Sequence, residues 1–255
     1  MFDPKTFRLD GAVALITGGG AGIGRAIAET FAGAGAAVMV SDLDADAARA
    51  VADDITKAGN QAASLDCDVT KEADLVRAVE QTVSRFGKLT ILVSNAGGGG
   101  PKPFDMPMAE FRRAFDLNVF SLFRLAQLAA PEMEKAGGGA MLAITSMAAE
   151  NKNRRMASYG SSKAATSHLV RNIAFDLGPA GIRVNAIAPG ATKTDALKSV
   201  LNDDIEKRML THTPINRLGE PADMANAALF MCSPAASWIS GQILTVSGGG
   251  VQELD

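Results

Sequence analysis

The chain is 255 residues long, is 47% hydrophobic and carries a formal net charge of −3, which is ordinary for a globular protein. This slightly acidic balance excludes the basic surface that a nucleic-acid partner needs, and no apolar run approaches the ~20 residues that span a bilayer. The amino terminus, MFDPKTFRLDG, lacks the basic start and apolar core of a secretion signal. We therefore expect a cytoplasmic protein without nucleic-acid or membrane partners.

Seven strand-like runs rich in Val, Ile and Leu follow one another along the chain, of which the third is the weakest. We expect these strands to be parallel and buried on both faces. Helical patterns long enough for right-handed crossovers separate most of them, over residues 24–33, 45–58, 71–86, 109–134 and 159–177. The predicted strands are 13–16, 38–40, 63–69, 91–93, 141–144, 184–187 and 243–246.

This alternation of strands and helices predicts an α/β protein with a Rossmann-like, doubly wound fold and helices on both faces of a seven-stranded parallel sheet. No linker, charge block or repeat interrupts it, so we predict a single domain over residues 1–255. The longest stretch without a strand signal is 191–240. Its polar first part, about 191–215, is a candidate substrate lid over the carboxyl ends of the strands, where open parallel sheets bind ligands.

A glycine-rich turn, TGGGAGIG at residues 17–24, follows the first strand and leads into a helix. Such a turn lets backbone amides approach a pyrophosphate, although the third glycine of the common dinucleotide fingerprint is replaced by Ile23. Asp42 ends the second strand, where its carboxylate can bind ribose hydroxyls and repel a 2′-phosphate. Because residues 38–46 contain no Lys or Arg, we predict NAD rather than NADP.

Tyr159, the only tyrosine, precedes Lys163 by four residues on a predicted helix, so the two side chains share one face. A phenol has an ordinary pKa near ~10, and a neighbouring ammonium favours its ionised form. Tyr159 is therefore a candidate acid/base. Ser146 lies thirteen residues before it, at the carboxyl end of a strand, where this fold delivers functional side chains.

Together these motifs resemble the short-chain dehydrogenase/reductase family over essentially the whole chain. The glycine spacing, the order Ser-x12-Tyr-x3-Lys, and Asn118 at the family's fourth catalytic position carry the resemblance. Residues 94–97, SNAG, resemble the family's NNAG and depart from it only at Ser94. The resemblance implies that Ser146 binds the substrate oxygen, that Lys163 binds the nicotinamide ribose, and that Asn118 secures a water leading from Lys163 to solvent.

The same resemblance assigns a set of cofactor contacts. Asp68 matches an adenine-contacting aspartate, and the PG turn after the sixth strand places Ile187 and Thr194 at the nicotinamide carboxamide. The expected NAD-binding residues are Gly18, Gly22, Ile23, Gly24, Asp42, Asp68, Val69, Asn95, Gly97, Tyr159, Lys163, Ile187 and Thr194.

Residues 96–108, 144–153 and 244–254 are similar to the bacterial, steroid-oxidising members of this family. This similarity implies oxidation of the 7α-hydroxyl of bile acids such as cholate and chenodeoxycholate, and a homotetramer. Arg154 and Arg155 could attract an anionic bile-acid tail or be merely solvated. An apolar slot for the steroid, or simply core, is expected from Met147, Ala148, Ile187, Leu197, Val200, Leu201 and Met209.

Two alternatives remain open at this point. A 3-ketoacyl-carrier-protein reductase has the same four catalytic residues but typically uses NADPH, which Asp42 disfavours. A silent dinucleotide sensor keeps the glycine turn but tends to lose the Tyr/Lys pair. No metal site is expected, because Cys67 and Cys232 are far apart, as are His168 and His212. We expect both cysteines to be buried, reduced thiols, and the histidines to lie on a helix surface and in a loop.

Overall fold

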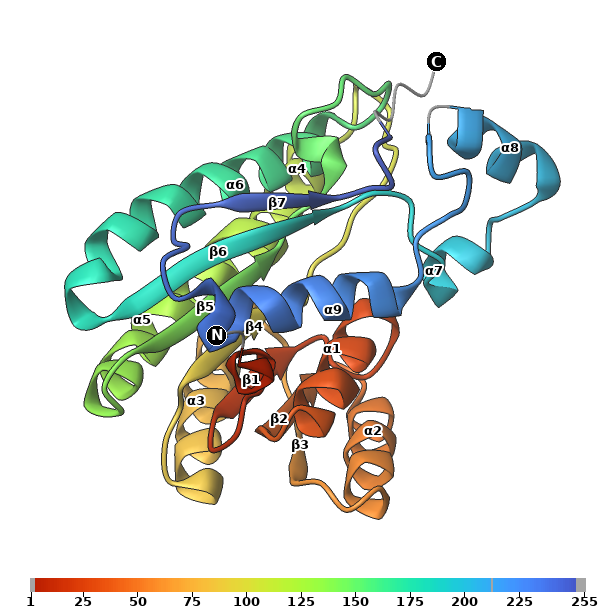
Figure 1. Cartoon of the computed structure of the whole chain (residues 1–255). Helices are drawn as coiled ribbons and strands as arrows, with labels where there is room; N and C mark the ends of the chain where they lie inside the picture. The colour runs from red at the N-terminus through yellow and green to blue at the C-terminus, as the bar shows by residue number, and fades with distance from the viewer. Residues whose placement is uncertain (1–2, 212, 251–255) are drawn as a thin grey trace.

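A seven-stranded parallel sheet runs through the centre of the molecule (Figure 1). The computed structural model describes residues 3–211 and 213–250. The strand order is β3-β2-β1-β4-β5-β6-β7, so the chain reverses its direction of winding between β1 and β4. This confirms the predicted fold class. The strands are β1 (Val13–Thr17), β2 (Ala37–Asp42), β3 (Ala62–Asp66), β4 (Ile91–Ser94), β5 (Gly139–Ile144), β6 (Ile182–Pro189) and β7 (Ile243–Val246).

Helices cover both faces of the sheet because alternate residues of each central strand point to opposite sides. Ala14 and Ile16 of β1 face a cluster formed with α1 (Gly22–Gly33), α2 (Ala45–Lys57) and α9 (Pro221–Cys232). Leu15, between them, faces a second cluster with α3 (Glu72–Phe86), α5 (Ser121–Lys135) and α6 (Ala157–Leu177). The two clusters hold the sheet rigid beneath its carboxyl edge.

The two edge strands differ from the sequence prediction. Burial on both faces holds for the central strands but is wrong for β7, where Leu244 and Thr245 are exposed, and for most of β3. An edge strand has a neighbour on one side only, so fewer helices shield it. β3 also ends at Asp66, three residues before the predicted end, because Asp68 and Thr70 turn the chain into α3.

The helical pattern expected over 109–134 is not one continuous α-helix. It consists of α4 (Met108–Phe115), a π-helical turn η2 (Asp116–Phe120) and α5. The π turn carries Asn118, whose carbonyl accepts a hydrogen bond from the Thr166 hydroxyl of α6 at 3.0 Å. Single π turns inside helices commonly mark functional sites.

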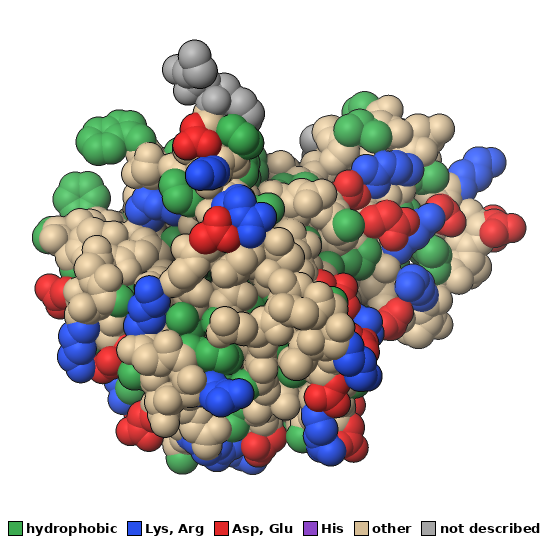
Figure 2. Space-filling model, turned by 60° about the horizontal axis from the view of Figure 1, so that its bottom comes forward, with side chains coloured by type: hydrophobic (Ala, Val, Ile, Leu, Met, Phe, Trp, Pro, Cys, Tyr) green, Lys and Arg blue, Asp and Glu red, His purple; other side chains and the backbone are tan. Residues whose placement is uncertain are grey.

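The segment after β6 contains α7 (Asp195–Lys198) and α8 (Asp203–Thr211), which project from the carboxyl edge of the sheet (Figure 1). Figure 2 shows side chains of both charges interspersed over one face of the molecule, including this projection. The 3-10 turns are η1 (Pro4–Phe7), η3 (Met147–Ala149), η4 (Gly178–Ala180) and η5 (Pro234–Ala236). Within the described ranges, no helix combines the length and apolar character needed to cross a bilayer.

Both cysteines are free and buried, as expected. Burial raises the pKa of the Cys67 thiol to about 11 and that of Cys232 to about 12, so both stay protonated at neutral pH. His168 is exposed on α6, as predicted, and His212 lies outside the described residues.

Candidate active site

A cavity of about 620 Å³ opens at the carboxyl ends of the central strands, around the point where the winding reverses. Open α/β sheets bind ligands at this place. Most of the residues predicted from the sequence line it together. They are Gly18, Gly22, Ile23, Asp42, Asp68, Val69, Asn95, Gly97, Ser146, Tyr159, Lys163 and Thr194.

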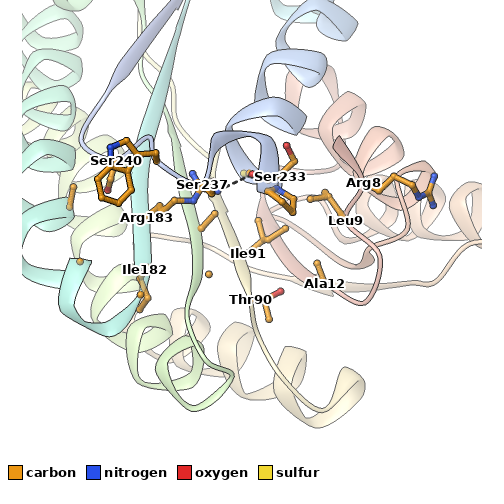
Figure 3. Close-up of a pocket in the computed structure, with 18 of the residues that line it drawn as sticks. Arg8, Leu9, Ala12, Thr90, Ile91, Ile182, Arg183, Ser233, Ser237 and Ser240 are labelled. Atoms are coloured by element: carbon orange, nitrogen blue, oxygen red, sulfur yellow. Dashed lines mark hydrogen bonds between the residues drawn. The ribbon is translucent and has the colours of Figure 1, made fainter. Parts of the chain in front are cut away.

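A second cavity, of about 780 Å³, lies at the opposite edge, among the amino ends of β4, β5 and β6 (Figure 3). Its two guanidinium groups are already engaged. Arg183 donates to the carbonyl oxygens of Met231, Ile239 and Ser233, and Arg8 binds the Asp10 carboxylate. Although this cavity is larger, none of the predicted site residues lines it, and we place the chemistry in the first one.

The glycine turn forms one end of the site. Gly24 lies so close to the Gly18 carbonyl oxygen that a β-carbon at position 24 would overlap it, so this helix start tolerates no side chain. The Asn95 amide donates to the carbonyl oxygens of Thr17 and Gly18, at 3.0 and 2.8 Å. These bonds brace the turn, and Gly18, Gly22 and Ile23 line the cavity at the start of α1, a position that suits a pyrophosphate.

Asp42 stands beside this turn at the end of β2. Its two carboxylate oxygens accept hydrogen bonds from the backbone amides of Gly20, at 2.9 Å, and Asp44, at 3.1 Å. No ion pair joins Asp42 to a Lys or Arg in the part of the chain that the structure describes. The fixed, unneutralised carboxylate fits the ribose of NAD and opposes a 2′-phosphate.

Asp68, which the family resemblance implies at the adenine, lines the cavity. Its carboxylate accepts hydrogen bonds from the Thr70 hydroxyl, at 2.6 Å, and the Thr70 amide, and lies 3.4 Å from the Lys71 ammonium. These bonds, the Thr70 hydroxyl foremost, hold the pKa of Asp68 below its usual range. The group is therefore an ionised acceptor at neutral pH.

Tyr159 and Ser146 meet at the other end, where the first turn of α6 faces the end of β5. Burial raises the pKa of Tyr159, and a hydrogen bond with Ser146 lowers it in part. The sequence led us to expect Lys163 to lower this pKa, but the lowering contribution comes from Ser146, and the net shift is upward because the phenol is buried. Ser146 is itself fixed, because its hydroxyl accepts from the Ala148 amide at 3.1 Å.

Lys163 is buried behind Tyr159. Its ammonium lies 5.9 Å from the centre of the tyrosine ring and donates to the Ile144 carbonyl oxygen at 2.7 Å. Burial lowers the pKa of Lys163 to about 8. The expected sharing of one helix face by Tyr159 and Lys163 thus places a weakly held proton beside the phenol.

Three predicted residues do not line the cavity. Gly24 and Asn118 lie directly behind its wall, and the Asn118 amide binds both backbone groups of Gly98, at 3.0 and 2.9 Å. Ile187 is a core residue whose carbonyl oxygen accepts from the amide and hydroxyl of Thr145. Thr194 does reach the cavity, where its hydroxyl also caps α7 by accepting from the Leu197 amide.

The seven apolar residues expected to form a steroid slot do not form one surface in this structure. Met147, Ala148 and Ile187 are buried, whereas Val200 is exposed on the projecting segment. None of the seven lines the cavity. Arg154 and Arg155 are both exposed and do not line the cavity, and the Arg155 carbonyl accepts from the Lys102 amide at 2.7 Å.

Sequence reasoning missed the polar residues that hold the site from behind. Thr17 accepts from the amides of Asn95 and Ala96, while Ser162 and Thr166 of α6 bind Asn118. The sequence spacing could have identified Ser162 and Thr166. They follow Tyr159 by three and seven residues, the spacing that places side chains on one helix face.

Comparison with known proteins agrees with this geometry. A family model described as enoyl-(acyl carrier protein) reductase matches residues 18–250. The chain is 68% identical to 7α-hydroxysteroid dehydrogenase of Escherichia coli K12 over the full length of both proteins. It is 33% identical to 3-oxoacyl-[acyl-carrier-protein] reductase of Aquifex aeolicus, covering 95% of this chain and 98% of that one.

Solved structures show the same relationship. A 7α-hydroxysteroid dehydrogenase complexed with NADH and 7-oxo glycochenodeoxycholic acid has a TM-score of 0.98 and 67% identity, with 100% of both chains covered. A short-chain type dehydrogenase/reductase from Mycobacterium marinum has a TM-score of 0.92 and 34% identity, covering 98% of this chain and 99% of that one. This chain belongs to the short-chain dehydrogenase/reductase family.

Proposed function

We propose that this enzyme oxidises the 7α-hydroxyl of bile acids, such as cholate and chenodeoxycholate, to the 7-ketone with NAD. The observation that carries the proposal is the 68% identity, over both full lengths, to a 7α-hydroxysteroid dehydrogenase. The cavity supports it, because it joins a glycine turn and a ribose-binding carboxylate to a Ser/Tyr pair.

In this proposal the site residues divide the work. NAD, when bound, accepts the hydride from the alcohol carbon. Tyr159 removes the alcohol proton, and Ser146 hydrogen-bonds the substrate oxygen, which aligns it with the phenol. Lys163 keeps a positive charge and a labile proton next to Tyr159, with the nicotinamide ribose as its further partner. Asn118, which binds Gly98, stabilises the wall behind them.

Cofactor choice follows from Asp42. A carboxylate held by two backbone amides accepts hydrogen bonds from ribose hydroxyls but repels a 2′-phosphate, so we propose NAD. The same feature disfavours the 3-ketoacyl-carrier-protein reductase alternative, which typically uses NADPH. The clustering of Ser146, Tyr159 and Lys163 in one cavity disfavours a silent dinucleotide sensor.

We further propose that the enzyme is a homotetramer of the cytoplasm. Exposed apolar side chains on the α4–α5 segment, namely Met108, Phe120 and Phe123, provide surface that association would bury. The two free thiols suit a reducing compartment.

The test is absorbance at the NADH band with cholate, chenodeoxycholate and deoxycholate, each with NAD and with NADP. Deoxycholate lacks the 7-hydroxyl and is the matched control substrate. We expect turnover of the first two with NAD, and loss of at least ~1000-fold in kcat for Tyr159→Phe with NADH affinity unchanged. Turnover of deoxycholate at an equal rate, or silence with all three, would overturn the substrate assignment.

A further inference from the structure

Ser162 is a fully buried hydroxyl on α6 that joins two parts of the site. Its Oγ donates to the Tyr159 carbonyl oxygen at 2.8 Å and accepts from the Asn118 amide nitrogen Nδ2 at 3.0 Å. The second hydrogen of Nδ2 goes to the Gly98 carbonyl oxygen at 2.9 Å. Both donor positions of the Asn118 amide are therefore used, one by Ser162 and one by the loop after β4.

The loop held by Asn118 packs directly on the catalytic tyrosine. Gly99 has a φ of +144°, and a β-carbon there would lie 2.5 Å from Cδ2 of the Tyr159 ring. The bonded path from Ser162 through Asn118 and Gly98 therefore ends on this ring. Because Ser162 also binds the Tyr159 carbonyl oxygen, these contacts form a closed circuit that starts at the Tyr159 backbone and returns to the Tyr159 ring.

Burial makes this path sensitive to the loss of one atom. Asn118 and Ser162 are shielded from water, so a donor on Nδ2 that loses its partner finds no replacement in solvent. The Asn118 backbone has a separate tie, the hydroxyl of Thr166, which would remain. The two bonds between the Asn118 amide and the Gly98 backbone would also remain. Removal of the Ser162 hydroxyl should thus loosen the Asn118 side chain and the Gly98–Gly99 loop together, because their side-chain bond to α6 is lost, while α6 and the π turn stay in place.

We propose that Ser162 is a positioning residue that holds the Tyr159 phenol against Ser146 through Asn118 and the Gly98–Gly99 loop. The inference rests on the proposed function only in that Tyr159 is the acid/base. A merely structural role for Ser162 would change stability, whereas a positioning role changes the ionisation and the reactivity of Tyr159.

Ser167 supplies a matched control on the same helix. Its hydroxyl is also buried but has no hydrogen-bond partner among the described residues, so Ser167→Ala removes the same atom and breaks no bond. We expect Ser162→Ala to lower kcat with chenodeoxycholate about tenfold, with the KM for NAD within about twofold of wild type. Ser167→Ala should keep the wild-type kcat.

A second measurement needs no substrate. Tyr159 is the only tyrosine, so phenolate absorbance titrates this one group, with Tyr159→Phe as the blank. Burial is the larger cause of its raised pKa, and Lys163 faces its ring from the same helix unchanged in both variants. A loosened loop admits water, which lowers this pKa, and weakens the bond with Ser146, which raises it. Because burial is the larger of the two causes, Ser162→Ala should lower the apparent pKa overall, and Ser167→Ala should leave it unchanged.

A double-mutant cycle with Asn118→Ala tests the route. If Ser162 acts through Asn118, its loss should reduce kcat less than about twofold further in that background. The positioning role is overturned if the two serine variants share one kcat and one titration curve, or if the losses in kcat multiply. Inactivity of the wild type with every bile acid would instead contradict the proposed substrate, and the phenolate titration would still decide the role of Ser162.

Discussion

At the scale of single residues, we propose that the choice of cofactor depends on one carboxylate, that of Asp42. Removal of its charge-assisted bonds to the ribose should cost about 1.5–3 kcal/mol of transition-state binding. We expect Asp42→Ala to lower kcat/KM with NAD about 10–100-fold and to narrow the preference for NAD over NADP. Steady-state kinetics with both cofactors would measure the two changes. The control is Asp46→Ala, which replaces an exposed aspartate on α2. An unchanged preference would mean that another group discriminates.

We expect the burial of the Lys163 ammonium to lower the free energy of unfolding at neutral pH. Its folded pKa of about 8 lies below the ordinary value of 10.5, so between these values the unfolded chain binds the extra proton. Stability therefore rises with pH across this window, and the full penalty is present below it. We expect Lys163→Met to be more stable than wild type at pH 7, by roughly 1–3 kcal/mol, and to lose this advantage near pH 10.

Urea unfolding of both proteins across that pH range would measure the difference, with loss of turnover as the second expected effect of Lys163→Met. A variant less stable than wild type at every pH would show that the bond from Lys163 to the Ile144 carbonyl outweighs the burial of charge.

Residue spacing made part of the site predictable. Tyr159 and Lys163 share a face because a helix repeats every 3.6 residues, and Ser146 stands at a strand end. The bonds that Asn118 makes are different in kind, because they join residues 20 and 44 positions apart. Such pairings are set by the packing of α6 on the π turn, which no local pattern encodes.

At the scale of elements, the sequence located every strand but not its surroundings. Central strands were correctly expected to be buried on both faces, since their apolar runs are continuous. β7 has the same kind of run, yet it lies at the edge of the sheet and is half exposed. Periodicity likewise indicated a helix around Asn118 without revealing the π turn, because one extra residue barely changes the spacing.

Arg183 of β6 fixes the carboxyl end of α9. Figure 3 shows this arginine next to Ser233, the residue that follows the helix. Its guanidinium donates to three carbonyl oxygens, and burial lowers its pKa. We expect Arg183→Met to lower the free energy of unfolding by roughly 2–4 kcal/mol, because these carbonyls lose a shared donor. Chemical denaturation would measure it, and kcat of the folded enzyme should be unchanged.

Arg49→Ala is the control for that measurement, because Arg49 forms an exposed ion pair with Asp46 and should change stability by less than about 0.5 kcal/mol. Equal effects of the two substitutions would mean that the bonds at the end of α9 contribute little.

At the scale of the whole molecule, the fold brings distant segments to one edge. The segments that follow β1 and β4 lead to helices on opposite faces of the sheet where the winding reverses, and residues of both segments line the cavity. The glycine turn and Asp42 come from one half of the sheet, and Ser146 and Tyr159 from the other. The doubly wound class of the sheet was predictable from the sequence. The shape of the cavity was not, because segments far apart in sequence form its walls.

The segment 191–215 begins at the cavity, and we propose that it closes over bound ligands as a lid. Thr194, Asp195 and Ala196 line the cavity, while Lys198, Lys207 and Arg208 are exposed on α7 and α8. Ligand that contacts the first group should order the segment and protect the second from protease.

We expect trypsin to cut the free enzyme first within 198–208, and NADH with a 7-keto bile acid to slow this cleavage at least about tenfold. Fragment masses identify the site, and cleavage at Lys57, exposed on α2, provides the internal control for protease activity. NADH alone should protect partially, because Thr194 belongs to the cofactor end of the segment. Equal cleavage within 198–208 with and without both ligands would show that the segment is a fixed wall, and substrate specificity would then reside in the loops after β4 and β5.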